Sequence, residues 1–285
     1  YFLQYAFGMS CRRLYQQLNN VYHFLQADFW RTWYRFPDRA LTLYGVTGTN
    51  GKTTTCHILA GVLAADYGKD KVGMITTIAV RIGERDSVNE TKLTTLPSQL
   101  VYKYLSQMKQ VGVEQAVVEM TSHALDQHRL AGIQLAGAIV THIEREHLNY
   151  HGTMEEYVAA KQRIVSYLRS SAPLVGNRDN AWVNQILEFG ASHGANVVGY
   201  SGEEIESSTT PLLGAINREN ALAVRKLAHA LGLTSEDVER GVAAVDHVPG
   251  RMEKVENDRG LNIIIDYAVT PQALEKLYQS VAPST

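Results

Sequence analysis

The chain has 285 residues, 45% of them hydrophobic, and a formal net charge of −2. This length is sufficient for a large core and more than one domain. The nearly balanced charge gives no sign of a nucleic-acid-binding surface. Two cysteines are too few for a disulfide scaffold and match a reducing compartment. Because there is neither a run of ~20 apolar residues nor a signal-peptide pattern, we expect a cytoplasmic protein.

Residues 1–40 are rich in aromatic side chains and read as an arm of one or two amphipathic helices that ends near residues 36–38. The aromatic stripe favours an arm that packs on the following domain or on a partner, because such stripes are more often core than membrane anchor. Membrane-surface contact is the alternative, since arginines accompany the aromatic residues: Arg12, Arg13, Arg31 and Arg35.

Residues 45–55, GVTGTNGKTTT, follow an apolar run at 41–44 and predict a strand, a glycine-rich loop and a helix over 54–65. Gly48 and Gly51 lack a Cβ, so the backbone can turn tightly and direct its N–H groups at phosphate oxygens. The Lys52 ammonium suits the outer phosphates, and the Thr53 hydroxyl suits Mg²⁺. Val46 occupies the position of the first glycine of the usual P-loop spacing, so this is a variant loop. The predicted nucleotide-binding residues of the loop are Gly48, Thr49, Asn50, Gly51, Lys52, Thr53 and Thr54.

Strand and helix patterns alternate after the loop. Apolar runs predict strands at 72–78, 115–119, 135–141 and from 172, and helical spacing predicts helices at 97–110 and 154–168. This alternation predicts an α/β fold with a mostly parallel sheet and helices on both faces. Ligands should bind outside the carboxyl ends of the strands. The polar stretch at 202–210 is interpreted as a loop.

A second group of residues, AVVEMTSHALDQHR at 116–129, places Glu119 at the end of a predicted strand. A hard cation prefers oxygen ligands, and a rigid strand would hold this carboxylate in place. Many buried strands end in an acidic residue, so the signal is weak alone. Beside the glycine-rich loop it predicts a site for Mg²⁺ and a nucleotide.

Six motifs then occur in the order found in the Mur ligases, which the chain resembles over residues 41–280. They are TGTNGKTTT, VVEMTSHALDQHR, THIEREHLNYHGTMEEYVAAKQRI (141–164), GAINRENALA (214–223), PGRME (249–253) and DYAVTPQAL (266–274). The motifs look most like the MurE-type branch, which adds the third residue to the UDP-N-acetylmuramoyl peptide. The resemblance implies a P-loop-type central ATP-binding domain at 41–248 and the beginning of a C-terminal α/β domain at 249–285.

In this family the γ-phosphoryl group of ATP passes to a substrate carboxylate, and an amine attacks the acyl phosphate to form an amide. The resemblance therefore implies ATP and Mg²⁺ as cofactors, and a UDP-N-acetylmuramoyl peptide and an amino acid as substrates. Cations must offset the crowded anionic groups. The residues at the matching metal positions are Thr53, Glu119, His147 and Lys161, the last as a carbamylated lysine. The implied catalytic residues are Lys52, Glu119, His147, Lys161 and Arg251.

Later segments match the family's nucleotide contacts. Asn217 and Asn220 lie three residues apart, on one helical face, where amides can pair with a purine edge. Asn220 matches the adenine contact better, and Asn217 could instead cap the helix. Arg251 looks like the γ-phosphate arginine, and Asp266, after a strand at 262–265, matches the ribose contact.

The resemblance also implies an acceptor site formed by Thr94, Thr95, Thr121, Gln127 and Arg129. His142, Glu146, Asn149 and Val269 depart from the residues that the family commonly has. The arm is shorter than the UDP-holding domain of a MurE-type enzyme, and only the start of a third domain is present. We therefore expect the chain to bind nucleotide without completing ligation. Two other functions stay open: a ligase of the folylpolyglutamate or cyanophycin type, and a non-catalytic nucleotide-binding protein.

Overall fold

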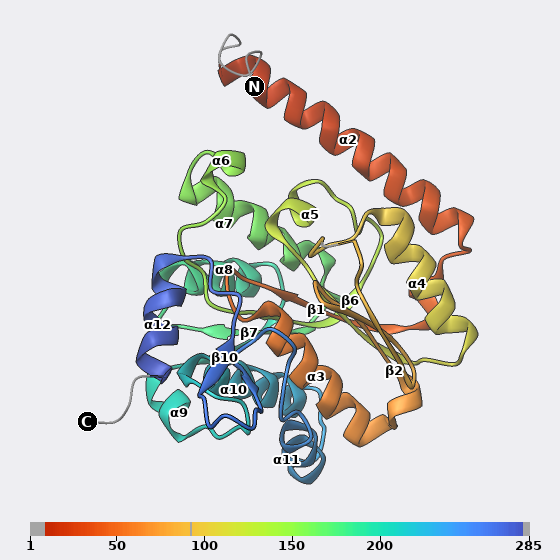
Figure 1. Cartoon of the computed structure of the whole chain (residues 1–285). Helices are drawn as coiled ribbons and strands as arrows, with labels where there is room; N and C mark the ends of the chain where they lie inside the picture. The colour runs from red at the N-terminus through yellow and green to blue at the C-terminus, as the bar shows by residue number, and fades with distance from the viewer. Residues whose placement is uncertain (1–8, 92, 282–285) are drawn as a thin grey trace.

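A computed structural model describes residues 9–91 and 93–281, with an eight-stranded sheet at its centre (Figure 1). The strand order is β4-β3-β2-β5-β1-β6-β7-β8. The six neighbouring strands β2, β5, β1, β6, β7 and β8 pair in parallel. At one edge, β3 pairs antiparallel with both β2 and β4. Their bounds are β1 Thr42–Thr47, β2 Val72–Ile75, β3 Ala79–Ile82, β4 Arg85–Val88, β5 Gln115–Glu119, β6 Leu135–Val140, β7 Pro173–Asn177 and β8 Asn196–Tyr200. The predicted α/β fold is confirmed.

Two hydrophobic cores lie on the two faces of the sheet. Side chains alternate along a strand, so Leu43 and Val118 enter one core while Tyr44 and Val117 enter the other. The first core is covered by α4 Ser98–Gln110, α5 Ser122–Asp126, α7 Met154–Gln162 and α8 Ala181–Ser192. The second is covered by α3 Lys52–Tyr67, α10 Ala215–Ala230 and α11 Ser235–Ala243. Shorter elements are α6 Leu148–His151 and three 3₁₀ helices: η1 Pro37–Ala40, η2 Lys69–Lys71 and η3 Arg163–Tyr167.

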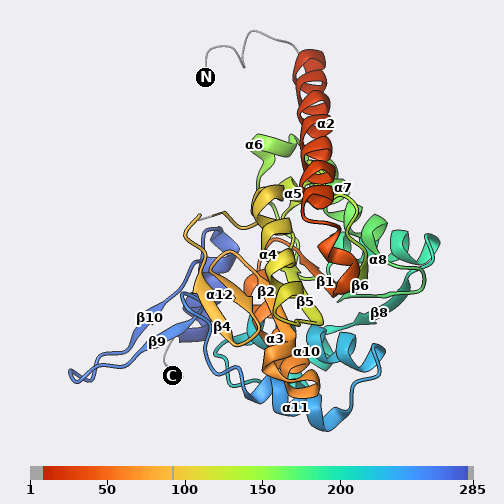
Figure 2. The same ribbon diagram turned by 90° about the vertical axis from the view of Figure 1, so that its right-hand side faces the viewer.

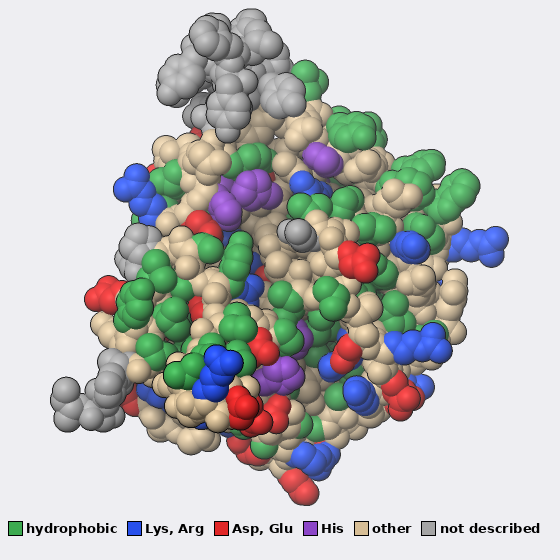
Figure 3. Space-filling view, viewed as in Figure 1, with side chains coloured by type: hydrophobic (Ala, Val, Ile, Leu, Met, Phe, Trp, Pro, Cys, Tyr) green, Lys and Arg blue, Asp and Glu red, His purple; other side chains and the backbone are tan. Residues whose placement is uncertain are grey.

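The N-terminal arm contains one long helix, α2 Met9–Trp33, which extends beyond the sheet (Figure 2). Its carboxyl half packs on the first core through Ala27, Trp30 and the following Tyr34, in agreement with the packing interpretation. Hydrophobic side chains are exposed along its outward face (Figure 3), namely Leu18, Val21, Tyr22, Leu25, Phe29 and Trp33. None of the helices in the described part of the chain is long and apolar enough to cross a membrane. Contact with a membrane surface stays a prediction.

Two predicted segments differ from the structure. Residues 202–210 are not entirely a loop, because Gly202–Ser207 forms α9. Ser201 and Glu204 form a capping box, in which the Ser201 N–H donates to the Glu204 carboxylate at 3.3 Å, and Glu204 also pairs with Lys226 on α10. The predicted helix at 154–168 is α7 followed by η3.

The C-terminal segment returns to the edge where the strands end. The short strands β9 Glu253–Val255 and β10 Ile263–Ile265 pair antiparallel, and α12 Pro271–Val281 then lies beside α10 (Figure 1). This arrangement brings Arg251, Met252 and the segment from Asp266 onward to the glycine-rich loop, whereas the hairpin between β9 and β10 projects away from it (Figure 2). The domain limits at 40 and 248 stay predictions.

Candidate functional site

The glycine-rich loop connects β1 to α3 and requires glycine at two positions. Gly48 has φ of +149° and Gly51 has φ of +87°, both in a region that side-chain-bearing residues rarely adopt. A Cβ atom on Gly48 would collide with the Thr141 hydroxyl, and one on Gly51 would collide with the Asn220 side chain. The loop therefore packs too closely against Thr141, which follows β6, and against Asn220 of α10 for any larger residue.

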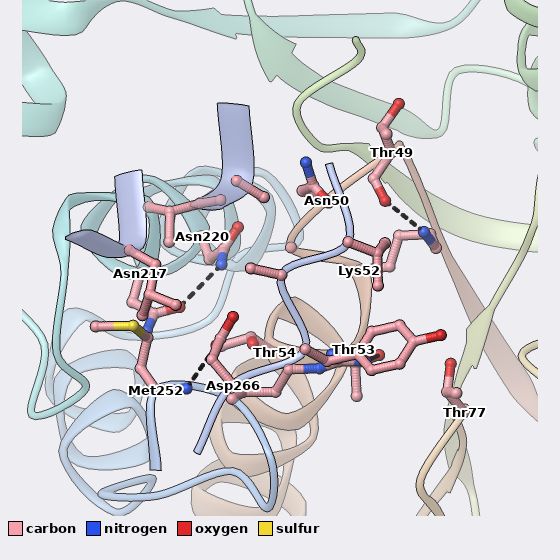
Figure 4. A pocket seen from close by; sticks show the side chains of 18 of the residues that line it. Thr49, Asn50, Lys52, Thr53, Thr54, Thr77, Asn217, Asn220, Met252 and Asp266 are labelled. Carbon is pink, nitrogen blue, oxygen red and sulfur yellow. Dashed lines mark hydrogen bonds between the residues drawn. The ribbon is translucent and has the colours of Figure 1, made fainter. Parts of the chain in front are cut away.

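Hydrogen bonds fix the rest of the loop. The Thr49 N–H donates to the His142 carbonyl at 2.7 Å, and the Thr141 hydroxyl donates to the Asn50 carbonyl at 2.7 Å. The Lys52 ammonium folds back on the loop and donates to the Thr49 carbonyl at 2.7 Å (Figure 4). It also donates to the Gly48 carbonyl at 3.2 Å. Because these partners are only carbonyls, the cation is available to exchange them for phosphate oxygens.

Glu119 ends β5 beside the loop, and its carboxylate is buried. It accepts hydrogen bonds from the Thr53 hydroxyl at 3.0 and 3.1 Å and from the N–H and hydroxyl of Thr77 at 2.9 and 3.0 Å. Thr77 was not predicted from the sequence, since no motif marks it. The Glu119 carboxylate and the threonine hydroxyls offer oxygen ligands, which Mg²⁺ prefers. Within residues 9–91 and 93–281 no group of three or more His, Cys, Asp or Glu could hold a metal, so hydroxyl oxygens would have to contribute.

One pocket collects the loop and residues from distant segments (Figure 4). The predicted residues that line it are Thr49, Asn50, Gly51, Lys52, Thr53, Thr54, Thr94, Glu119, Thr121, His147, Asn217, Asn220, Arg251 and Asp266. The Asn220 amide donates to the Asn217 Oδ1 at 3.2 Å, and the Asn217 amide donates to the Leu213 carbonyl at 2.6 Å. The N-cap of α10 is Gly214, so Asn217 is not the helix cap.

Arg251 and Asp266 reach the pocket from the C-terminal segment. The Arg251 guanidinium lies 4.8 Å from the centre of the Tyr267 ring, and its Nη2 is 3.5 Å from the Thr53 hydroxyl. The Asp266 carboxylate accepts a hydrogen bond from the Met252 N–H at 2.8 Å. Tyr267 is a further lining residue that sequence reasoning missed, although it is adjacent to Asp266 in the DYAVTPQAL motif.

Lys161 does not line the pocket but lies beneath the loop. Its side chain on α7 is 1% exposed, and its Nζ donates to the Gly48 carbonyl at 2.5 Å. Burial, and then the nearby Lys52 charge, hold the pKa of the Lys161 amine well below its usual value. Burial therefore favours the uncharged amine of Lys161 more than solvation favours it in an ordinary surface lysine.

His147 borders the pocket within a group of aromatic rings. It precedes α6 in a left-handed conformation with φ of 54°. Burial lowers its pKa, and Glu146, whose carboxylate is 3.4 Å from the His147 Nε2, acts in the opposite direction. The His123 ring lies 4.9 Å from the His147 ring and 4.1 Å from the Tyr150 ring, and burial lowers the pKa of His123 to about 4. His123 was not singled out from the sequence, although it lies in the SHAL motif.

Hydrogen bonds connect four of the five residues predicted to bind the acceptor substrate: Thr95, Thr121, Gln127 and Arg129. The hydroxyls of Thr95 and Thr121 are 3.1 Å apart. The Arg129 guanidinium donates to the Thr95 carbonyl at 3.1 Å and to the Gln127 side chain at 2.8 Å. Thr94 and Thr121 line the pocket itself, whereas Thr95, Gln127 and Arg129 are connected to it through the hydrogen bond between Thr95 and Thr121.

The strand, glycine-rich loop and helix, set in a mostly parallel sheet with an acidic residue at the end of the adjacent strand, define a P-loop-type α/β protein. Residues 46–207, which are more than half of the chain, match the model of the Mur ligase middle domain. The chain therefore belongs to the Mur ligase family, as its motifs predicted.

Curated relatives are tripeptide-forming ligases. The chain is 34% identical over 273 residues to UDP-N-acetylmuramoyl-L-alanyl-D-glutamate–2,6-diaminopimelate ligase of Gloeobacter violaceus, with 88% of this chain and 55% of that protein covered. It is 34% identical over 292 residues to UDP-N-acetylmuramyl-tripeptide synthetase of a Roseiflexus species, with 88% and 56% covered. The chain thus spans about half the length of these relatives.

Solved structures of Mur ligases and of a folylpolyglutamate synthase have a similar fold. A UDP-N-acetylmuramoyl-L-alanyl-D-glutamate–2,6-diaminopimelate ligase matches with a TM-score of 0.68 at 26% identity, over 87% of this chain and 56% of the other. Folylpolyglutamate synthase of Mycobacterium tuberculosis, complexed with ADP and AMPPCP, matches with a TM-score of 0.74 at 19% identity, over 91% and 70%. The second likeness shows the shared fold alone.

Proposed function

We propose that the chain binds ATP with Mg²⁺ as part of a cytoplasmic ligase that adds an amino acid to a UDP-N-acetylmuramoyl peptide in peptidoglycan synthesis. The main support is the convergence of Lys52, Glu119, Asn220 and Arg251 on one pocket, although they come from segments far apart in the sequence. The similarity to diaminopimelate ligases supports the acceptor, and it makes a diamino acid the first candidate for the incoming amine.

Within this proposal, the loop backbone and Lys52 bind the phosphates, and Arg251 adds a second cation at the γ-phosphate. Asn217 and Asn220 contact the adenine, and Asp266 accepts hydrogen bonds from the ribose hydroxyls. Tyr267, which lies against the Arg251 guanidinium, would help to hold that cation at the mouth of the pocket. Each residue predicted to bind the nucleotide and found in the pocket thus has a proposed role.

Thr53 and Glu119 would hold one Mg²⁺, and His147 with Lys161 would hold a second; both would supply positive charge to offset the phosphate and carboxylate groups that meet during phosphoryl transfer. Lys161 could take part only after its amine has gained CO₂ as a carbamate with loss of a proton, because an ammonium would repel the metal. The lowered pKa of Lys161 supports this modification, since the uncharged amine is the form that reacts with CO₂.

Thr94, Thr95, Thr121, Gln127 and Arg129 would together orient the muramoyl peptide so that its carboxylate faces the γ-phosphate. Arg129 suits this task because burial is compensated by two fixed hydrogen bonds that leave its remaining guanidinium N–H groups for an anion. The amine would then attack the acyl phosphate and form the amide.

Two measurements test the proposal. Titration calorimetry of this chain with ATP, with and without Mg²⁺, should show metal-dependent binding, and its absence would contradict nucleotide binding. In the full natural protein, ADP release should require UDP-N-acetylmuramoyl-L-alanyl-D-glutamate and a diamino acid. Release that requires a folate and glutamate instead would identify the folylpolyglutamate alternative. ATP binding without release for any acceptor would favour the non-catalytic alternative.

A further inference from the structure

Glu144 is a buried residue that touches the nucleotide loop through both its backbone and its side chain. Its N–H donates to the Thr49 hydroxyl at 3.1 Å, and its carbonyl accepts from the same hydroxyl at 3.2 Å. Its carboxylate Oε1 accepts a hydrogen bond from the Asn50 side chain. Glu144 therefore holds two successive loop residues.

The same carboxylate oxygen also accepts a hydrogen bond from the Thr270 hydroxyl at 2.6 Å, across 126 positions of sequence. Thr270 is buried and immediately precedes α12, and its hydroxyl accepts a hydrogen bond from the Ala273 N–H at 3.2 Å. Asp266 and Tyr267 lie just before it, and α12 contributes Ala273, Leu277 and Ser280 to the pocket wall. One carboxylate thus joins the loop to the segment that forms the opposite wall.

The buried Glu144 carboxylate accepts few hydrogen bonds, so the loss of any one of them should be costly. The Glu144 Oε2 has no hydrogen-bond partner in the described part of the chain, and the His142 Nε2 lies 3.8 Å from it. A buried carboxylate is tolerated only when donors compensate for its lost hydration. Asn50 and Thr270 each donate one hydrogen bond to the Glu144 carboxylate. Loss of either bond should therefore weaken the attachment of residues 266–281 to the loop.

We propose that Glu144 is a positioning residue that fixes residues 266–281 against the nucleotide loop and so couples nucleotide binding to the placement of this segment. The inference rests on the proposed nucleotide binding. It also makes Thr270 the point at which the segment is attached. If Asp266, Tyr267 and α12 are held in place before the nucleotide arrives, less ordering remains to oppose binding.

The test compares Thr270→Val, which keeps the side-chain shape and loses the hydroxyl, with Thr270→Ser, which keeps the hydroxyl. Calorimetry with ADP and Mg²⁺ should give a dissociation constant about tenfold higher for Thr270→Val. Hydrogen exchange over 266–281, measured without nucleotide, should become faster. Thr270→Ser should match the wild-type chain in both measurements. A wild-type dissociation constant and unchanged exchange in Thr270→Val would overturn the inference.

A double-mutant cycle separates the Glu144 contact from simple capping of α12. Glu144→Met has a similar volume but replaces the carboxylate with a thioether, which is only a weak acceptor. Thr270→Val should therefore raise the ADP dissociation constant by less than about twofold in that background. An equal effect of Thr270→Val in both backgrounds would show that only the helix cap matters and would reject the coupling. If the wild-type chain itself fails to bind ADP, the proposed function fails, while the exchange comparison still tests the attachment of the segment. Matching circular dichroism spectra would show that the variants are folded.

Discussion

The amines of Lys52 and Lys161 meet at a single acceptor, the carbonyl oxygen of Gly48, at 3.2 and 2.5 Å. Two ammonium groups this close repel each other, and only Lys52 has access to the pocket. Burial and the Lys52 charge lower the pKa of Lys161, which favours the uncharged amine of Lys161 beside the pocket-lining cation of Lys52. A charged Lys52 suits phosphate binding, and an uncharged amine at Lys161 suits carbamylation.

Lys161→Ala in the full natural protein should therefore abolish most ligase activity, measured as ADP release. A short carboxylic acid in the buffer should restore part of it by occupying the vacated ligand position. Lys161→Arg should not be rescued, because its guanidinium stays positively charged. An unimpaired Lys161→Ala enzyme would mean that the lysine has no part in catalysis.

Lys52→Ala should weaken ATP binding by roughly tenfold or more, because it removes a charge that faces the phosphates. Titration calorimetry measures the effect. Lys103→Ala, an exposed lysine on α4, serves as the matched control and should bind ATP like the wild-type chain. Equal affinity in the Lys52 and Lys103 variants would rule out the P-loop assignment.

Glu119→Gln should reduce the gain in ADP affinity that Mg²⁺ provides by about tenfold or more, since an amide is a poorer ligand for a hard cation. Affinity in EDTA should change little. The exposed Glu188→Gln on α8 is the control and should keep the full metal dependence. A Glu119→Gln chain with the wild-type response to Mg²⁺ would place the metal elsewhere.

Gly48→Ala should lower the free energy of unfolding by about 2–4 kcal/mol, because the new methyl group collides with the Thr141 side chain at an unfavourable φ. Gly194→Ala provides the comparison: its φ is +82°, but nothing lies within 4 Å of the added Cβ. That variant should lose only about 1 kcal/mol. Equal losses in urea denaturation would show that the loop has room for a side chain.

Stability should fall as the pH drops from 6.5 to about 4, with His57 as a contributor. Burial, followed by the Arg81 charge, lowers the pKa of His57 to about 4, and its Nε2 is buried without a hydrogen-bond partner in the described part of the chain. In this window the unfolded chain binds a proton that the folded chain does not, so the loss from His57 reaches up to about 3 kcal/mol.

Urea denaturation across this pH range measures the loss. His57→Phe should flatten the dependence, and the exposed His193→Gln should leave it unchanged. A steep pH dependence that persists in His57→Phe would assign the effect to other groups.

The sequence by itself determined the features that depend on local spacing. The apolar run, Gly48, Gly51 and Lys52 specify a strand, a tight loop and a helix, and the run at 115–119 specifies a strand that ends in Glu119. Alternation of such units was enough to predict the parallel sheet. The local signal failed at 202–207, where polar composition suggested a loop although Ser201 and Glu204 cap a helix.

Only the tertiary structure decided which distant residues meet. Thr77 donates to Glu119, Lys161 lies beneath Gly48, and Glu144 joins Asn50 to Thr270. No spacing pattern encodes these contacts, because each depends on how separate elements pack and on the register of the strands that carry them. Likewise, the lowered pKa of Lys161 follows from its burial, which is a property of the folded molecule and of no short segment of the chain.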